Sequence, residues 1–131
     1  MGIIEKMRLD GKKGFVTGAA RGIGKCTATA FAEAGADVAI VDLDIAEAEK
    51  TAKEIAEAKG RIVIAIKCDV TSEEDVQAMV DKVVAEFGGL DFCHANAGIC
   101  INAAADEMTY AQWTKNMRSC PTPAWTSTAC P

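Results

Sequence analysis

The chain has 131 residues, of which half are hydrophobic and a quarter are charged, and its formal net charge is −5. These values predict one soluble globular domain with a core of moderate size. The acidic balance and the lack of a basic stripe argue against nucleic acid and anionic membranes as partners. No apolar window approaches the length of a membrane span and no signal sequence is recognisable, so we expect a cytoplasmic protein.

The cysteines do not follow the spacing of a metal site or a disulfide framework. The chain has six cysteines and one histidine, and no two cysteines form a C-x-x-C pair. Several of the cysteines occupy apolar positions, where a free thiol behaves as a small hydrophobic group. We therefore predict reduced cysteines and no bound metal.

The hydrophobic pattern alternates between strands and helices along the chain. Strands are expected at residues 13–17, 37–41, 61–67 and 90–95, and helices at residues 22–34, 45–59 and 72–87. Such alternation predicts an α/β fold: a Rossmann-type doubly wound parallel sheet, truncated to about four strands in the order 3-2-1-4. A ligand would then lie over the carboxyl ends of the first and fourth strands.

Each expected helix has a predicted inward face. For the three helices in chain order, these faces are Ile23, Ala30, Phe31 and Ala34; Ala48, Ala52, Ile55 and Ala56; and Val76, Met79, Val80, Val83, Val84 and Phe87. Ser72 and Asp75 have the spacing of a capping box at the start of the third helix.

A glycine-rich segment, T-G-A-A-R-G-I-G at residues 17–24, joins the first strand to the first helix. Gly18 permits the sharp turn out of the strand, Gly22 lets the backbone approach a pyrophosphate, and Gly24 lets the helix pack close to the strand. The helix N-terminus adds unpaired N–H groups and a positive dipole end. In this context the segment predicts a dinucleotide-binding loop.

An acidic residue, Asp42, ends the second strand about twenty residues after the glycines, where a carboxylate binds the adenosine ribose. A carboxylate there repels a 2′-phosphate, so we predict NAD as the cofactor in preference to NADP. One alternative is that Asp42 and Asp44 only cap the next helix. Arg21 is a second source of ambiguity, because a cation beside the loop can hold a 2′-phosphate or remain a solvated surface charge.

The composition changes abruptly near Arg118. All three prolines fall within the last eleven residues, and the segment from residue 119 onward carries no charged residue. We interpret residues 1–117 as an NAD(P)-binding half-domain. We interpret residues 118–131 as an aberrant tail that is disordered or out of frame, with natural evolution of a half-domain as the alternative.

Three motifs in order resemble the short-chain dehydrogenase/reductase family over about residues 9–117: the glycine segment, Cys68-Asp69-Val70, and Asn96-Ala97-Gly98. The resemblance implies that Asn96 braces the fourth strand against the glycine loop, whereas a plain turn residue is the alternative. It also implies a set of cofactor-binding residues: Gly18, Arg21, Gly22, Ile23, Gly24, Asp42, Leu43, Asp69, Val70, Asn96, Ala97 and Gly98.

The catalytic set of that family is not found in this chain. The family uses a tyrosine with a lysine four residues later as its proton donor and acceptor, but the only tyrosine here, Tyr110, is followed at that distance by Thr114. Cys120 stands where the family's relay asparagine is usual, and family oligomer contacts are also expected to be missing. We predict an NAD(H)-dependent oxidoreductase of an alcohol or carbonyl substrate that lacks its catalytic half. The alternative is a non-catalytic dinucleotide-binding remnant or inactive truncated product.

Overall fold

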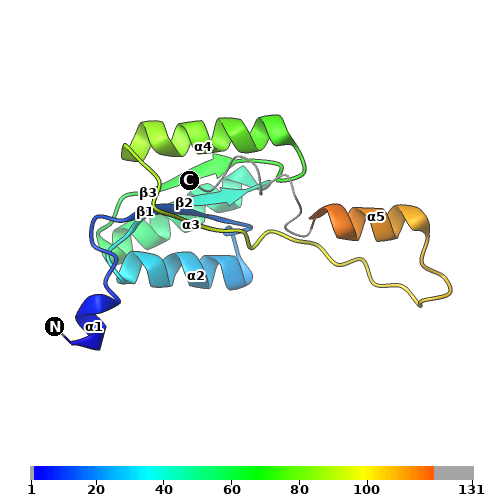
Figure 1. The fold of residues 1–131 in the computed structure, drawn as a ribbon, viewed down its shortest axis with the longest axis horizontal. Helices are drawn as coiled ribbons and strands as arrows, with labels where there is room; N and C mark the ends of the chain where they lie inside the picture. Colours follow the sequence, from blue (N-terminus) through cyan, green and yellow to red (C-terminus); the bar gives the residue numbers. More distant parts are fainter. Residues whose placement is uncertain (1, 120–131) are drawn as a thin grey trace.

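The structure is a computed structural model, and it describes residues 2–119 (Figure 1). Its elements, in chain order, are α1 (Ile3–Lys6), β1 (Lys13–Thr17), α2 (Gly22–Glu33), β2 (Asp37–Asp42), α3 (Ile45–Lys59), β3 (Val63–Lys67), α4 (Glu73–Phe87), β4 (Phe92–His94) and α5 (Tyr110–Ser119).

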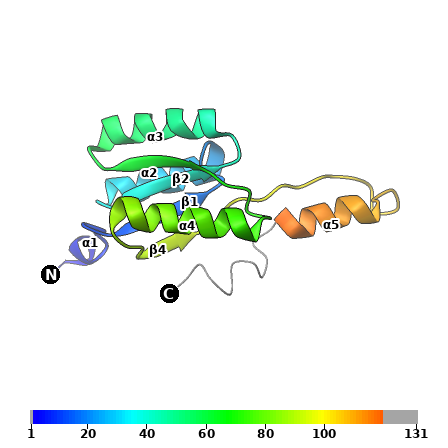
Figure 2. The same ribbon diagram turned by 90° about the horizontal axis from the view of Figure 1, so that it is seen from above.

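The four strands form one parallel sheet in the order β3-β2-β1-β4, which confirms the predicted topology. β1 pairs with β2 from Lys13 opposite Asp37 to Thr17 opposite Val41. The pairing of β1 with β4 is shorter and runs from Gly14 to Val16. β4 therefore lies at one edge of the sheet, next to β1 (Figure 2).

Alternate residues of the strands face opposite sides of the sheet, because the side chains of a strand alternate with a period of two. Val16, Val38 and Ile40 face α2 and α3 in one buried cluster. Phe15 and Val41 belong to a second cluster, which α4 covers on the opposite face. The sheet is thus a buried middle layer between two helical layers (Figure 1).

The predicted inward face of α2 was wrong in part. Ile23 is 77% exposed and Ala30 is exposed, while Gly24, Ala28 and Ala32 form the buried face. Small residues at this contact let the helix approach the sheet closely, and a side chain as large as isoleucine would hold it away. In α2, small size more than hydrophobicity decides which residues face the sheet.

The faces of the other two helices were predicted with one clear error. In α3, Ala48, Ala52 and Ile55 are buried as expected, together with Thr51. In α4, Val84 is 42% exposed although the predicted face included it, because it lies at the margin of the apolar stripe.

The expected capping box of α4 is half formed. The Ser72 hydroxyl accepts a hydrogen bond from the backbone N–H of Asp75 at 3.3 Å. The Asp75 carboxylate does not return to Ser72; it accepts from the backbone N–H of Asp69 at 3.1 Å. Helix α4 is therefore tied to the loop that follows β3.

Several element boundaries differ from the predicted ones. β3 begins at Val63, two residues later than expected, and β4 covers only Phe92–His94 of the predicted 90–95. Arg118 and Ser119, which the sequence places at the start of the tail, are the last residues of α5. The rest of the predicted tail, residues 120–131, lies outside the described residues.

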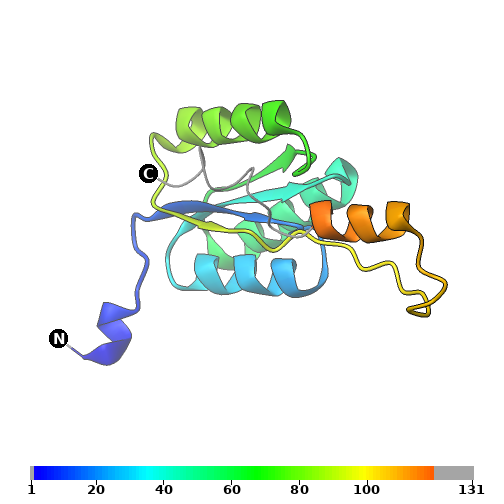
Figure 3. The same cartoon turned by 45° about the vertical axis from the view of Figure 1, so that its right-hand side comes forward.

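After β4 the chain runs outward from the carboxyl ends of the strands and returns as α5, which lies beyond that end of the sheet (Figure 3). Polar side chains of α5 fasten the returning helix to the outgoing chain. Asn116 accepts from the Ile101 N–H at 2.7 Å and donates to the Ile101 carbonyl at 3.0 Å. Helix α5 is consequently held near the predicted ligand site.

Candidate dinucleotide site

The glycine loop has the backbone geometry that its sequence predicts. Gly18 and Gly22 both have a φ of 63°, in the left-handed region that favours glycine. A Cβ on Gly24 would lie 2.3 Å from the carbonyl oxygen of Gly18 and 2.7 Å from Nδ2 of Asn96. A Cβ on Gly22 would meet no atom within 4 Å, so the backbone at Gly22 faces open space.

The N-terminus of α2 lies next to this open backbone. Its N-cap residue, Arg21, makes no side-chain capping hydrogen bond. The first N–H groups of the helix thus lack the side-chain acceptor that usually satisfies one of them. Exposed N–H groups and the positive end of the helix dipole together favour an anion such as a phosphate.

Asn96 and Thr17 join the glycine loop to the end of β4. Nδ2 of Asn96 donates to the Thr17 carbonyl at 3.1 Å and to the Gly18 carbonyl at 3.3 Å. In return, the buried Thr17 hydroxyl accepts from the N–H groups of Asn96 and Ala97, both at 3.0 Å. These hydrogen bonds confirm that Asn96 braces β4 against the loop. The part taken by Thr17 was missed, because a threonine that ends a strand carries no distinguishing signal.

Asp42 fastens the other side of the loop to β2. One carboxylate oxygen accepts from the Ala20 N–H at 3.1 Å, and the other accepts from the Asp44 N–H at 3.1 Å. A carboxylate has about four acceptor positions, so capacity remains for hydroxyl donors of a ligand. The buried Thr51 hydroxyl donates to the Ala20 carbonyl at 2.6 Å and secures the loop from α3.

Arg21, which left the cofactor preference ambiguous, pairs with Asp44. The Arg21 guanidinium donates to the Asp44 carboxylate at 2.8 Å. The second Asp44 oxygen accepts from the Glu47 N–H at 3.2 Å, so Asp44 caps α3. The side chains of the pair are 69% and 48% exposed, and ion pairs of this kind contribute little to stability.

Asp69 follows β3 at the same rim of the sheet. Its carboxylate accepts from the Thr71 hydroxyl at 2.7 Å and from the Thr71 N–H at 2.9 Å. The hydroxyl donor, followed by the backbone donor, lowers the pKa of Asp69 from its ordinary value. Asp69 is therefore ionised, and its orientation is fixed by the turn.

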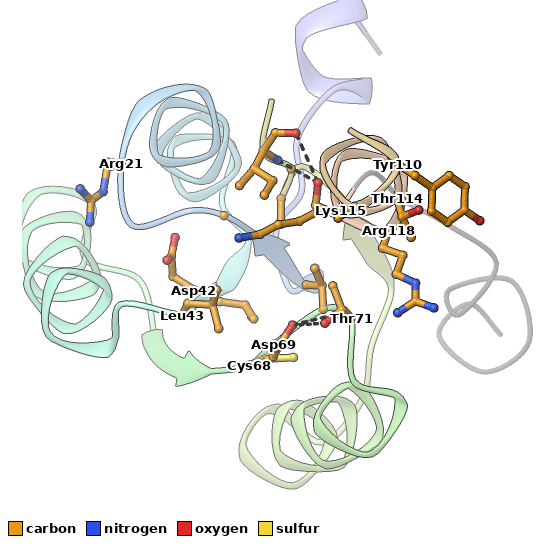
Figure 4. Close-up of a pocket in the computed structure, with 18 residues that line it drawn as sticks. Arg21, Asp42, Leu43, Cys68, Asp69, Thr71, Tyr110, Thr114, Lys115 and Arg118 are labelled. Carbon is orange, nitrogen blue, oxygen red and sulfur yellow. Dashed lines mark hydrogen bonds between the residues drawn. The ribbon is translucent and has the colours of Figure 1, made fainter. Parts of the chain in front are cut away.

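These segments surround a cavity of about 1060 Å³ over the carboxyl ends of the strands (Figure 4). This volume is at the upper end of the range of about 300–1,000 Å³ that is usual for small-molecule and cofactor sites. The cavity is lined by Gly18, Arg21, Val41, Asp42, Leu43, Cys68, Asp69, Val70, Thr71, Ala97, Gly98, Ile99, Tyr110, Ala111, Thr114, Lys115, Arg118 and Ser119.

Eight of the twelve predicted site residues line this cavity. The other four belong to the loop, its brace and the first turn of α2: Gly22, Ile23, Gly24 and Asn96. Of these, Ile23 points largely to solvent, with 77% of its surface exposed. The six lining residues of α5 were missed, because no motif in the sequence brings that helix to the cavity.

Cys68 lines the cavity but is almost fully buried, with 2% of its surface exposed. Burial, with smaller contributions from the charges of Asp75 and Asp69, raises the pKa of its thiol to about 11. Since the thiolate is the reactive form, we expect iodoacetamide at mildly alkaline pH to modify the exposed Cys26 and Cys100 well before Cys68. Mass spectrometry of the alkylated peptides measures the order, and equal rates would contradict the prediction.

Residues 2–119 contain no cluster of three or more histidine, cysteine, aspartate or glutamate side chains arranged to hold a metal ion. None of the helices in this part of the chain is long and apolar enough to cross a membrane.

A parallel sheet with a glycine loop, a strand-end carboxylate and a cavity at its carboxyl rim defines a Rossmann-type nucleotide-binding domain. The family model of the short chain dehydrogenases matches residues 12–127, so the chain belongs to that family. Proteins of this family bind NAD or NADP.

Individual relatives agree with this assignment. The chain is 42% identical to the D-threitol dehydrogenase of Mycolicibacterium smegmatis over 106 residues, which are 81% of this chain and 40% of that enzyme. It is similar to a short-chain type dehydrogenase/reductase from Mycobacterium marinum, with a TM-score of 0.87 and 36% identity over 91% of this chain and 48% of that one.

A third relative, the NADPH-dependent 3-quinuclidinone reductase of Rhodotorula rubra, has a TM-score of 0.80 and 32% identity over 90% of this chain and 45% of that one. The chain thus spans less than half the length of each of these three proteins.

Proposed function

We propose that this chain is the cofactor-binding half of an oxidoreductase that transfers hydride between NAD(H) and an alcohol or carbonyl substrate. The cofactor supplies the hydride chemistry, while the protein supplies binding and orientation. Family membership supports the reaction class, and the cavity beside the glycine loop supports the binding role.

The residues at the rim suit the parts of a dinucleotide. The open backbone at Gly22 and the N-terminus of α2 would hold the pyrophosphate. Asp42 would accept hydrogen bonds from the adenosine ribose, and Asp69 with Val70 would frame the adenine. Ala97 and Gly98 would form the floor of the cavity next to β4, on the nicotinamide side.

The observation that carries the preference for NAD is the orientation of Asp42. Its carboxylate is held in place by the N–H groups of Ala20 and Asp44, so it cannot easily turn away from a 2′-phosphate. Arg21, a cation that lines the same cavity, is already paired with Asp44. A 2′-phosphate would thus meet a fixed negative charge and a cation that must first leave its partner.

The test is the change in cofactor preference on replacing Asp42. We expect the parent chain to bind NAD more tightly than NADP, and Asp42→Ala to narrow that ratio by about tenfold, which is about 1.4 kcal/mol. Titration calorimetry with both dinucleotides measures the ratio. Glu49→Ala, an exposed acid on α3, is the control and should leave the ratio unchanged. Tighter binding of NADP by the parent chain would refute the preference.

A second candidate function is dinucleotide binding without turnover. The observation that favours it is the environment of Tyr110. This residue is 84% exposed at the start of α5, and Thr114 occupies the position where the family's lysine would stand. Cys26, Cys68 and Cys100 are free thiols, which suits a reducing, cytoplasmic setting for either candidate.

A further inference from the structure

Lys115 is a cation of the cavity that no motif accounts for. Its side chain extends from α5 into the cavity, toward the side on which Asp42 and Leu43 lie (Figure 4). Within residues 2–119 it takes part in none of the ion pairs, in contrast to Arg21, which pairs with Asp44. Arg118 also lines the cavity, but its guanidinium points away from Asp42 (Figure 4). Lys115 therefore has an ammonium group available to a ligand.

The position of Lys115 is fixed by its neighbours on α5. Asn116 forms two hydrogen bonds with the backbone of Ile101, at 2.7 and 3.0 Å. One turn further on, the buried Ser119 hydroxyl accepts from the Ile99 N–H at 3.2 Å. The helix is thus attached at two places to the chain that leaves β4. These contacts give the backbone of Lys115 a defined position at the rim of the cavity.

The charges already present around the cavity favour an anionic partner for this ammonium group. The pyrophosphate of a dinucleotide carries two negative charges, of which the N-terminus of α2 offsets the equivalent of about half a charge. The carboxylates of Asp42 and Asp69 are both engaged by backbone or hydroxyl donors. A lysine ammonium suits phosphate oxygens as a point charge.

We propose that Lys115 binds the pyrophosphate of the dinucleotide, so that α5 covers the cofactor from the side opposite the glycine loop. This inference rests on the proposed function and adds a residue from outside the glycine motif to the same site. The pyrophosphate is favoured over the 2′-phosphate because the chain that leads to α5 leaves β4, where Asn96 is hydrogen-bonded to the glycine loop that follows β1. The ribose end lies further along the sheet, over β2, where Asp42 and Arg21 are placed.

The test compares Lys115→Gln with the parent chain, using NAD, NADP, ADP-ribose and adenosine as ligands in titration calorimetry at low and moderate salt. We expect NAD, NADP and ADP-ribose to bind about 3- to 10-fold more weakly to the variant, as for the loss of one charge-assisted hydrogen bond. Their affinity should also depend less on salt, while adenosine should be unaffected. Lys82→Gln, an exposed lysine on α4 outside the cavity, should behave as the parent chain.

Unchanged affinity of Lys115→Gln for ADP-ribose would overturn the inference, and so would a loss confined to NADP, which would place Lys115 at the 2′-phosphate. If the parent chain binds none of these dinucleotides, the proposed function itself fails. An independent measurement uses the parent chain alone. ADP-ribose should slow acylation of Lys115 by an amine-reactive ester, relative to Lys82, and adenosine should not; equal rates would contradict the proposal.

Discussion

The purified chain is expected to show no dehydrogenase turnover with NAD and a broad panel of alcohols. Hydride transfer from an alcohol releases a proton, which a positioned base must accept, and such a group contributes about 10²–10⁴-fold to the rate. The only tyrosine, Tyr110, is exposed on α5 and has no lysine at the required spacing. The measurement is the increase in NADH absorbance with time.

The positive control for this assay is a full-length dehydrogenase of the family with its own substrate, which shows that the conditions allow turnover to be detected. A protein-dependent NADH signal that persists after repurification would show that residues of this chain supply a base. Tyr110→Phe would then decide whether that base is the tyrosine.

The largest expected effect on stability is that of Gly24→Ala. A Cβ at this position would lie 2.3 Å from the Gly18 carbonyl oxygen, 2.7 Å from Nδ2 of Asn96 and 2.9 Å from Cα of Ala19. Two of these atoms belong to the backbone of the glycine loop and cannot move independently of it. We expect the free energy of unfolding to fall by about 1–3 kcal/mol, the usual range for overpacking, as measured by urea denaturation.

Gly89→Ala is the matched control for this substitution. A Cβ on Gly89 would meet no atom within 4 Å, and its φ lies outside the left-handed region, so alanine should be neutral or slightly stabilising. Nucleotide binding should also weaken in Gly24→Ala and not in Gly89→Ala, because only the first moves the loop. Equal stability of the two variants would show that α2 shifts away from the loop without cost.

The sheet could be predicted from the sequence because its signals are local and agree with one another. The apolar runs of β1 and β2 end at the glycine segment and at Asp42, respectively. These signals leave few possible strand orders. The faces of the helices were less predictable. In the first turn of α2, Ile23 is exposed and its neighbour Gly24 is buried against the loop. The close approach of α2 to the loop depends on small residues rather than on hydrophobic ones.

The candidate site also has residues that the sequence predicts and residues that it does not. Asp42 is the last residue of β2, and Asp69 and Asn96 lie two residues after the ends of β3 and β4. The carboxyl ends of the parallel strands therefore bring all three to one rim. Lys115 could not be predicted, because residues 95–109 form no regular element that would indicate where α5 returns. The position of α5 depends on hydrogen bonds such as those of Asn116 with Ile101, which lie 15 positions apart. No repeating pattern in the sequence indicates such a contact.

The Thr17 hydroxyl has a consequence for the order in which the domain folds. Its two hydrogen bonds, to Asn96 and Ala97, join residues 79 and 80 positions apart. Closing so long a loop costs conformational entropy, which is recovered only when β4 docks beside β1. The candidate nucleotide site is therefore completed by one of the contacts that join the most distant positions among the described residues. During gradual denaturation, the ability to bind a dinucleotide should disappear when β4 detaches, while the pairing of β1, β2 and β3 still persists.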